Sequence, residues 1–356
     1  NCLLVQTLHT VNKKILYGNY WYSSGINKTM KIHLKKVVDE SLSLIKKRDI
    51  KILDIGCNDG TLISFYPKNI KCYGIDPSQI IKKIKNKKIT KINDYFPPSK
   101  KNFKRLNSKF SIITSIAMFY DIDDPNFFVK NIKYFLEKKG IWIFELSYMI
   151  DMLKLNSFDT ICHEHLEYYS TNVIMKMLKQ NDLKLFDHKF NKINGGSSQY
   201  FICHKKSTIK INKKNINKAL NFEKNIELEK VRTYKKYYYK IISIKNNLQR
   251  IITKIIKRGE IIHGYGASTK GNVLLQLMNI SNKEIKFIAE RNPNKYNKYT
   301  PGSKIKIISE ASSRRMMPNY YFVLPWHFKD EILIREKKVI SKGCRFIFPL
   351  PKIQIK

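Results

Sequence analysis

Two histidines, two glutamates, two tyrosines and a cysteine fall within eight residues of this chain, at Cys162–Tyr169. Acid–base chemistry is one possibility, because Glu164 or His165 could remove a proton next to a carbonyl group. A metal site is a second, since Cys162, His163 and His165 are zinc ligands by type. Crowding and the absence of an HExxH pattern argue against that site, and we predict no metal here. In a third interpretation a histidine only satisfies buried backbone groups, but the density of titratable side chains favours a functional role.

A glycine-containing loop that follows an apolar strand, residues 52–55, is the second candidate site. Gly56 and Gly60 allow its backbone to turn with positive φ and to approach a ligand closely. A dinucleotide-binding GxGxxG fingerprint would need glycine at the position of Asn58. The Asp-x-Gly-x-x-x-Gly form that begins at Asp54 instead resembles motif I of class I S-adenosylmethionine-dependent methyltransferases, whose cofactor carries no phosphate.

Further candidate cofactor contacts follow the next predicted strands. Asp76 ends the second strand, where its carboxylate is placed to accept hydrogen bonds from ribose hydroxyls. Asp94 ends a short third strand, and we expect it to meet the amino group of adenine. The fourth strand, at 110–117, leads into Ala117 and Met118. We expect these two residues to line the pocket, because ligands bind at the carboxyl ends of strands in open α/β sheets.

The elements that must position these residues alternate short apolar runs with helical patterns between residues 31 and 206, which is typical of an α/β domain. Strands are expected at 51–55, 71–75, 110–117, 141–144, 183–186 and 199–203. Residues 207–258 carry apolar side chains at three- and four-residue steps and predict a helical linker. Residues 259–356 begin with a strand, a glycine-rich turn and a helix at 261–277. We therefore predict a class I methyltransferase Rossmann-like sheet, a helical linker and a second Rossmann-like α/β domain.

Two more glycine-rich segments are candidate substrate-binding loops. The first either contacts a ligand or is only the turn between two strands, and it consists of Asn194, Gly195 and Gly196. The second joins a strand to a helix, where backbone N–H groups suit a diphosphate and a lysine adds positive charge. The second loop contains Gly264, Gly266, Lys270 and Asn272. In the alternative interpretation, the second loop serves only packing.

Together these motifs resemble the sugar C-methyltransferases of the deoxysugar-modifying type, and the resemblance covers nearly the whole chain. It rests on Tyr20–Gly25, the loop 54–60, Met118–Pro125, Cys162–Tyr169, Asn194–Ser197, Gly264–Asn272, Glu290–Pro293, Thr300–Gly302 and Leu324–Phe328. The resemblance implies an N-terminal zinc-binding module, a methyltransferase domain at 31–206 and a C-terminal Rossmann-like substrate-binding domain at 259–356. It also implies S-adenosylmethionine as cofactor and a nucleotide-linked keto-sugar, methylated on carbon, as substrate.

Carbon methylation of this kind needs a base that removes a proton next to the ketone and donors that stabilise the enolate oxygen. We expect His165 or Glu164 to be the base and His163 or Tyr22 to be the donor. We expect the second glycine loop to bind the pyrophosphate of the substrate. This chain has Cys162 where members of the family often have tyrosine, so the role of the base does not transfer directly.

Residues 1–30 are interpreted as a remnant of the zinc-binding module. Cys2 resembles the last ligand of that module, and most of the module has no counterpart in the sequence. We therefore expect no complete zinc site, and zinc only if the missing part is present.

The charge balance is extreme, with 68 Lys and Arg residues against 28 Asp and Glu residues and a net charge of +40. Such a balance raises the alternative of an RNA methyltransferase. Only ten of the basic residues are Arg, and Lys is spread over every segment. An AT-rich genome explains this better than a phosphate-binding track, because nucleic-acid readout usually relies on Arg. We therefore predict a small-molecule partner and no specific nucleic acid.

A rival function is an NAD(P)-dependent oxidoreductase that uses the second glycine loop, since Glu290 lies 24 residues past Gly266. The cysteines are scattered without CxxC spacing, which fits a reducing cytoplasm rather than a disulfide scaffold. No apolar run approaches the roughly 20 residues of a membrane span, so we expect no membrane partner and a cytoplasmic location.

Overall fold

The computed structural model describes residues 2–18, 23–26, 28–106 and 108–356. It divides the chain into two compact units. Unit 1 comprises Asn1–Met149 and His163–Ile226, and unit 2 comprises Ile150–Cys162 and Glu227–Lys356.

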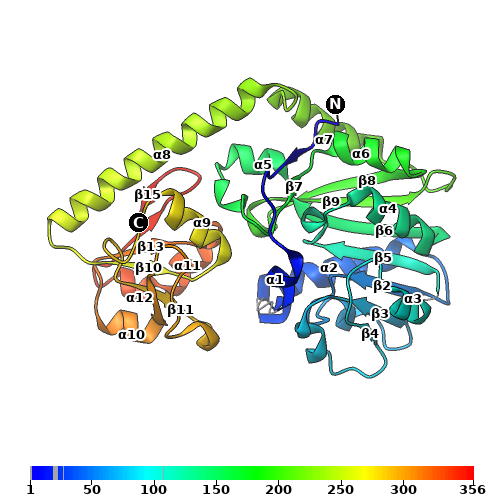
Figure 1. Ribbon diagram of the computed structural model, residues 1–356, viewed down its shortest axis with the longest axis horizontal. Coiled ribbons are helices and arrows are strands. Elements are labelled where there is room, and N and C mark those ends of the chain that lie inside the picture. Colours follow the sequence, from blue (N-terminus) through cyan, green and yellow to red (C-terminus); the bar gives the residue numbers. More distant parts are fainter. Residues whose placement is uncertain (1, 19–22, 27, 107) are drawn as a thin grey trace. The chain divides into compact units, whose positions relative to one another are not determined.

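Unit 1 is built on a seven-stranded sheet with the strand order β4-β3-β2-β5-β6-β9-β8 (Figure 1). The first five strands in this order run parallel, and β9 and β8 run antiparallel to their neighbours. The order reverses between β2 and β5, and ligands bind at the carboxyl ends of strands beside such a reversal. The strands are β2 (Lys51–Ile55), β3 (Lys71–Ile75), β4 (Thr90–Ile92), β5 (Phe110–Ile116), β6 (Leu136–Ser147), β8 (Leu183–Asn191) and β9 (Ser197–His204).

Both faces of this sheet are covered by apolar side chains. Helix α2 (Lys28–Leu44) buries Leu34, Val37 and Val38 in a cluster that includes Ile112 of β5. A second cluster joins Ile113 of β5 to α4 (Pro125–Phe135), α6 (Thr171–Gln180) and α7 (Lys213–Ile226). Adjacent residues of β5 therefore enter opposite clusters, as the pleat of a strand requires.

The ends of these helices are fixed by local capping. Asp124 accepts a hydrogen bond from the N–H of Phe127 at the start of α4, and Ser170 accepts one from Val173 at the start of α6. Such caps satisfy backbone donors that have no partner within the helix. The other elements of unit 1 are β1 (Val5–Gln6), α1 (Lys13–Gly18), α3 (Lys100–Phe103) and β7 (Glu167–Tyr168), and α5 (Met149–Lys154) begins at the boundary.

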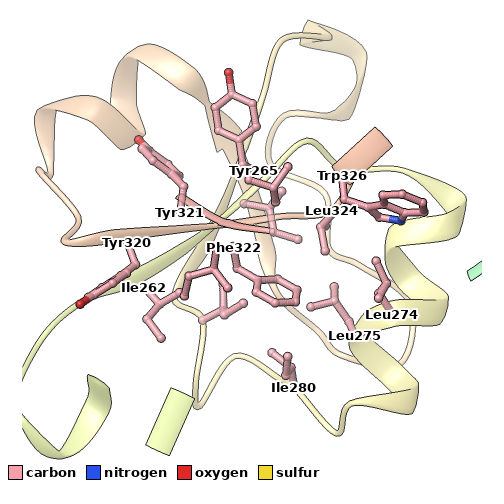
Figure 2. Close-up of a cluster of buried hydrophobic side chains, with 14 of the residues drawn as sticks. Ile262, Tyr265, Leu274, Leu275, Ile280, Tyr320, Tyr321, Phe322, Leu324 and Trp326 are labelled. Carbon is pink, nitrogen blue, oxygen red and sulfur yellow. The ribbon is translucent and has the colours of Figure 1, made fainter. Parts of the chain in front are cut away.

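Unit 2 has a six-stranded sheet with the order β12-β11-β10-β13-β14-β15, parallel except for β15. Figure 2 shows Phe322 of β13 pointing toward Leu275 of α9 (Thr269–Leu277), and β10, β13 and α9 contribute to one apolar cluster. The strands are β10 (Ile262–Tyr265), β11 (Phe287–Glu290), β12 (Lys306–Ser309), β13 (Tyr320–Val323), β14 (Arg345–Phe348) and β15 (Gln354–Ile355). The short helices are α10 (Glu310–Arg315), α11 (Lys329–Arg335) and α12 (Lys337–Ile340).

The segment predicted as a helical linker contains two helices, α7 and the 27-residue α8 (Val231–Lys257). Helix α7 belongs to unit 1 and α8 to unit 2. Ile241, Leu248 and Ile252 of α8 enter the core of unit 2.

The α/β fold class predicted from the sequence is confirmed, and each predicted strand of the first domain lies within an observed strand or overlaps one. Strands β1, β7, β12, β13 and β15 were not predicted. Among the described residues, the helices lack the combination of length and apolar character needed to cross a membrane.

Candidate functional site

The loop after β2 turns through three residues with positive φ, namely Gly56 at 70°, Asn58 at 52° and Gly60 at 75°. A Cβ atom at Gly56 would lie 2.9 Å from Cγ of Met118, so a larger residue would displace that side chain. A Cβ atom at Gly60 would lie 2.7 Å from Ile84. Backbone conformation and close packing therefore both require these glycines.

Asp76 lies at the tip of β3 and faces this loop. Its Oδ2 accepts a hydrogen bond from the Asn58 N–H at 2.9 Å, and its Oδ1 accepts one from the Ser78 N–H at 2.8 Å. One carboxylate oxygen can accept two hydrogen bonds, so Oδ2 keeps capacity for a further donor. The structure thus brings together Asp76 and the loop residues that the sequence predicted.

Asp54 lies inside the sheet. The hydroxyl of Thr114 donates to its Oδ1 at 2.6 Å, and only 3% of the residue is exposed. Burial raises the pKa of Asp54 to about 7; the charge of Asp76 adds to this rise, and the hydrogen bond from Thr114 opposes it. These contacts make Asp54 an anchor between β2 and β5.

The carboxylate of Asp94 accepts hydrogen bonds from residues of its own loop. Its Oδ2 accepts hydrogen bonds from the Ser99 N–H at 2.9 Å and from the Asn102 side chain at 2.9 Å, and its Oδ1 accepts one from the Tyr95 N–H at 2.9 Å. Burial raises the pKa of Asp94, but these hydrogen bonds outweigh it and leave the pKa below its ordinary value. The predicted contact with adenine would have to be made in addition to them.

The segment after β5 contacts the titratable cluster. The rings of Tyr120 and His165 meet edge-on with centroids 4.3 Å apart. The Leu166 N–H also donates to the carbonyl oxygen of Tyr120 at 2.9 Å. Ala117 adopts a φ of 54°, and the next residue, Met118, packs beside Gly56. His165 is therefore held at the carboxyl end of the strand that adjoins the glycine loop.

Acidic groups gather around this contact. Burial raises the pKa of Glu164. Burial and the charge of Glu164 raise the pKa of Asp121 well above its ordinary value. Burial also raises the pKa of Glu167 to about 7, against the hydrogen bond that it accepts from the Tyr169 hydroxyl at 2.8 Å. Asp121 lies within the Met118–Pro125 segment on which the resemblance rests, and the sequence analysis gave it no role of its own.

Two residues, His163 and Tyr22, were predicted to donate a hydrogen bond to the enolate oxygen. His163 is exposed, in a turn two residues before His165. Tyr22 lies outside the described residues. Cys2 is exposed and has a free thiol.

Residues just after Tyr22 are bonded to the glycine loop. The Gly25 N–H donates to Oδ2 of Asp59 at 2.9 Å, and the hydroxyl of Ser23 donates to the same oxygen. The Ser24 N–H donates to Oδ1 of Asn58 at 3.0 Å. Asp59 therefore has a role that the sequence analysis did not assign to it.

The Asn194–Gly196 segment connects β8 to β9. Gly195 and Gly196 have φ values of 90° and 120°, and the Gly196 carbonyl accepts a hydrogen bond from the Tyr148 N–H at 3.2 Å. Ser197 pairs with Ser147 at the end of β6, so the connection lies at the carboxyl edge of that strand. This segment is therefore the turn between two strands, which was one of the two roles predicted for it.

The second glycine loop follows β10 in unit 2. Gly266 has a φ of 79°, and a Cβ atom there would lie 2.8 Å from Pro325. The Ala267 N–H donates to Oε2 of Glu290 at 2.8 Å, and the Lys295 side chain donates to the Ala267 carbonyl at 2.6 Å. A carboxylate therefore already occupies one backbone donor of this loop. Gly264 packs against Ile288, and a Cβ atom at Gly264 would lie 2.7 Å from that side chain.

Lys270 and Asn272 lie on α9, which Ser268 caps by accepting the Gly271 N–H at 3.0 Å. Asp159, which the sequence analysis missed, interacts electrostatically with Lys270 and accepts a hydrogen bond from the Trp326 indole at 2.9 Å. Burial raises the pKa of Asp159, and the positive charge of Lys270 opposes that rise.

Comparison with known proteins matches both halves of the chain. Residues 28–188 match the family described as a methyltransferase domain, and residues 192–351 match the C-methyltransferase C-terminal domain. The chain is similar to the C-methyltransferase NovU of Streptomyces niveus, with 25% identity over 99% of this chain and 85% of that protein.

Two solved structures are similar to this chain over about half of its length. An S-adenosylmethionine-dependent methyltransferase from Clostridium acetobutylicum is 15% identical, over 51% of this chain and 93% of that chain, with a TM-score of 0.40. Magnesium protoporphyrin IX methyltransferase from Synechocystis is 12% identical, over 54% of this chain and 92% of that chain, with a TM-score of 0.39.

Proposed function

We propose that this chain, which belongs to the methyltransferases that join a methyltransferase domain to a C-methyltransferase C-terminal domain, methylates a carbon atom of a nucleotide-linked keto-sugar. S-adenosylmethionine is the proposed methyl donor. The observation that carries the proposal is the contact between His165 and Tyr120, which holds a titratable cluster beside the glycine loop. The free cysteines support a cytoplasmic setting for this reaction.

The loop fits a nucleoside cofactor without phosphate. Asp76 keeps acceptor capacity for a ribose hydroxyl, and the glycines let the backbone approach the ligand. When bound, this cofactor supplies a methyl group that is already activated by its positively charged sulfur. The protein therefore needs no covalent intermediate, and it has to align the reacting atoms and exclude water.

The chain itself must generate the carbon nucleophile. His165 or Glu164 removes the proton next to the ketone, and a hydrogen-bond donor, His163 or Tyr22, stabilises the oxygen of the resulting enolate. Burial favours the neutral form of Glu164, so the carboxyl group can return a proton as well as take one.

In unit 2 the second glycine loop and Lys270 bind the pyrophosphate of the substrate. The proposal rests on the start of α9 behind the loop and on the positive charge of Lys270 at that start. Glu290 favours the opposite outcome, because its carboxylate already takes the Ala267 N–H and would repel an anion there.

Calorimetry with S-adenosylhomocysteine tests the cofactor assignment directly. Turnover with methyl-labelled S-adenosylmethionine and a nucleoside-diphosphate keto-sugar, followed by mass spectrometry of the product, then locates the methyl group. Label on carbon supports the proposal. Label on oxygen or nitrogen, or no binding heat with the demethylated cofactor, contradicts it.

A further inference from the structure

One segment of unit 2, Ile150–Cys162, lies along the edge of its sheet at which the parallel strands end. The side chain of Asn156 donates to the carbonyl oxygen of Pro351, just after β14, at 2.7 Å. Asp159 accepts a hydrogen bond from the indole of Trp326, just after β13, at 2.9 Å. The segment is therefore bonded to the chain beyond the carboxyl ends of two neighbouring strands.

The same segment contacts the helix behind the second glycine loop. Its short 3-10 helix, Phe158–Thr160, packs against α9, which follows β10, and Phe158 enters the apolar core of unit 2. The strand order of this sheet reverses between β10 and β13. Because ligands bind at the carboxyl ends of strands beside such a reversal, the segment lies where an open α/β sheet receives its ligand.

Polar atoms of this segment are buried without partners. Asp159 is 1% exposed, and its Oδ1 has no hydrogen-bond partner within the described part of the chain. The same is true, among those residues, of Oδ1 of Asn156 and of the hydroxyl of Ser157. Burying polar atoms without partners costs free energy, so a bound molecule can replace this arrangement at little cost.

Lys270 lies on the first turn of α9 and interacts electrostatically with Asp159. Its charge also acts on the imidazole of His327, the residue after Trp326. The lysine that is proposed to hold the pyrophosphate therefore already interacts with a carboxyl group of the chain itself. Two anions that need the same cation compete for it, because each neutralises the charge that attracts the other.

We infer that Asp159 is an internal occupant of the anion position beside Lys270, and that a diphosphate group displaces it when the substrate binds. The inference rests on the proposed function, which assigns Lys270 to the pyrophosphate. A diphosphate carries more negative charge than a carboxylate and offers more acceptor oxygens, so it interacts more strongly with Lys270 than Asp159 does. Asp159 thereby makes the loop selective for ligands that carry a diphosphate over ligands that carry a single weak anion.

Calorimetry with inorganic pyrophosphate on the full chain measures this competition for any nucleoside that the substrate carries. We expect Asp159→Asn to tighten binding about three- to tenfold, because the amide leaves the charge of Lys270 free and can still accept the hydrogen bond from Trp326. Asp151→Asn, on α5 of the same segment, is the matched control and should bind like the wild type. In a Lys270→Ala background, Asp159→Asn should change the affinity less, since the lysine for which the two anions compete is absent.

NMR of the indole N–H groups tests the displacement itself on the full chain labelled with 15N-tryptophan. A Trp326→Phe variant assigns the signal. Pyrophosphate should shift the Trp326 signal, because the carboxylate that accepts its hydrogen bond moves away. The Trp142 indole donates to the hydroxyl of Ser115 at 3.0 Å in unit 1 and should keep its signal. An unchanged Trp326 signal at saturating pyrophosphate would overturn the inference.

The outcomes separate the inference from the proposed function. Equal or weaker binding in Asp159→Asn, together with weakened binding in Lys270→Ala, would overturn the role of Asp159 and leave the pyrophosphate site standing. No binding in either the wild type or Asp159→Asn would contradict the pyrophosphate site, and the inference would fall with it. Binding in Asp159→Asn alone would support both. If Asp159→Asn does not fold, the Trp326 signal of the wild type decides.

Discussion

The ring of His165 stands edge-on to the ring of Tyr120 at a centroid distance of 4.3 Å, one residue away from a hydrogen bond between the Leu166 N–H and the Tyr120 carbonyl. These contacts fix the imidazole to the segment that follows β5. They also bring Glu164 close enough to Asp121 to raise the pKa of that buried carboxyl group. A histidine and two carboxyl groups thus share one end of the sheet.

Replacing His165 with Asn tests whether this histidine moves a proton. We expect turnover to fall at least about 100-fold, since general acid–base catalysis contributes about 10²–10⁴. Affinity for S-adenosylhomocysteine should stay unchanged, because His165 is not part of the glycine loop. Steady-state kinetics and calorimetry measure the two quantities, and near-normal turnover would remove His165 from the mechanism.

Asp54 should make stability depend on pH. Burial raises its pKa from 3.8 to about 7, so the folded chain keeps a proton that the unfolded chain releases above pH of about 4. The free energy of unfolding should therefore be highest below that pH and fall as pH rises to about 7, by up to about 4 kcal/mol from this group. Urea unfolding across this range measures the fall.

The variant Asp54→Asn removes this titration and should flatten that part of the curve. Asp39→Asn, at an exposed position on α2, is the control and should keep the wild-type slope. Parallel curves for wild type and Asp54→Asn would show that Asp54 is already charged in the folded chain.

The sequence predicted those parts of the site whose residues lie close together along the chain. Asp54 lies in β2, Gly56 and Gly60 lie on the loop that follows it, and the parallel pairing of β2 with β3 brings Asp76 to the same edge. Their arrangement follows from local backbone rules together with parallel pairing.

Other parts could not be predicted, because they depend on tertiary contacts between distant segments. Ser23 and Asp59 are 36 positions apart, and nothing in the pattern around either residue points to the other. Strand β13 was missed because four consecutive buried residues, Tyr320–Val323, show no alternation that distinguishes a strand from a buried helix segment.

Asp59 should hold residues 23–25 against the glycine loop. Its Oδ2 accepts from the Gly25 N–H at 2.9 Å and from the hydroxyl of Ser23, and hydrogen bonds to a charged group contribute about 1.5–3 kcal/mol. In Asp59→Ala we expect amide exchange at Gly25 to speed up at least about tenfold. Hydrogen–deuterium exchange measures this rate; Asp39→Ala is the control, and unchanged protection would contradict the assignment.

The second glycine loop should bind a nucleoside diphosphate through Lys270, although the negative charge of Glu290 opposes this binding. Lys270→Ala should weaken binding of a bare nucleoside diphosphate about tenfold, because an ion pair to phosphate is lost. Gly266→Ala should abolish it, since the new Cβ atom would meet Pro325 at 2.8 Å in a backbone of positive φ.

Glu290→Gln distinguishes a binding loop from one that serves packing alone. If phosphate approaches the Ala267 N–H, removing the carboxylate charge should tighten binding several-fold, because repulsion of the anion disappears while the amide side chain can still accept the hydrogen bond. Calorimetry with the nucleoside diphosphate measures the change, and thermal unfolding checks that the loop remains folded. Equal affinity in wild type, Lys270→Ala and Glu290→Gln would mean that the loop packs against Pro325 and Ile288 without holding the substrate.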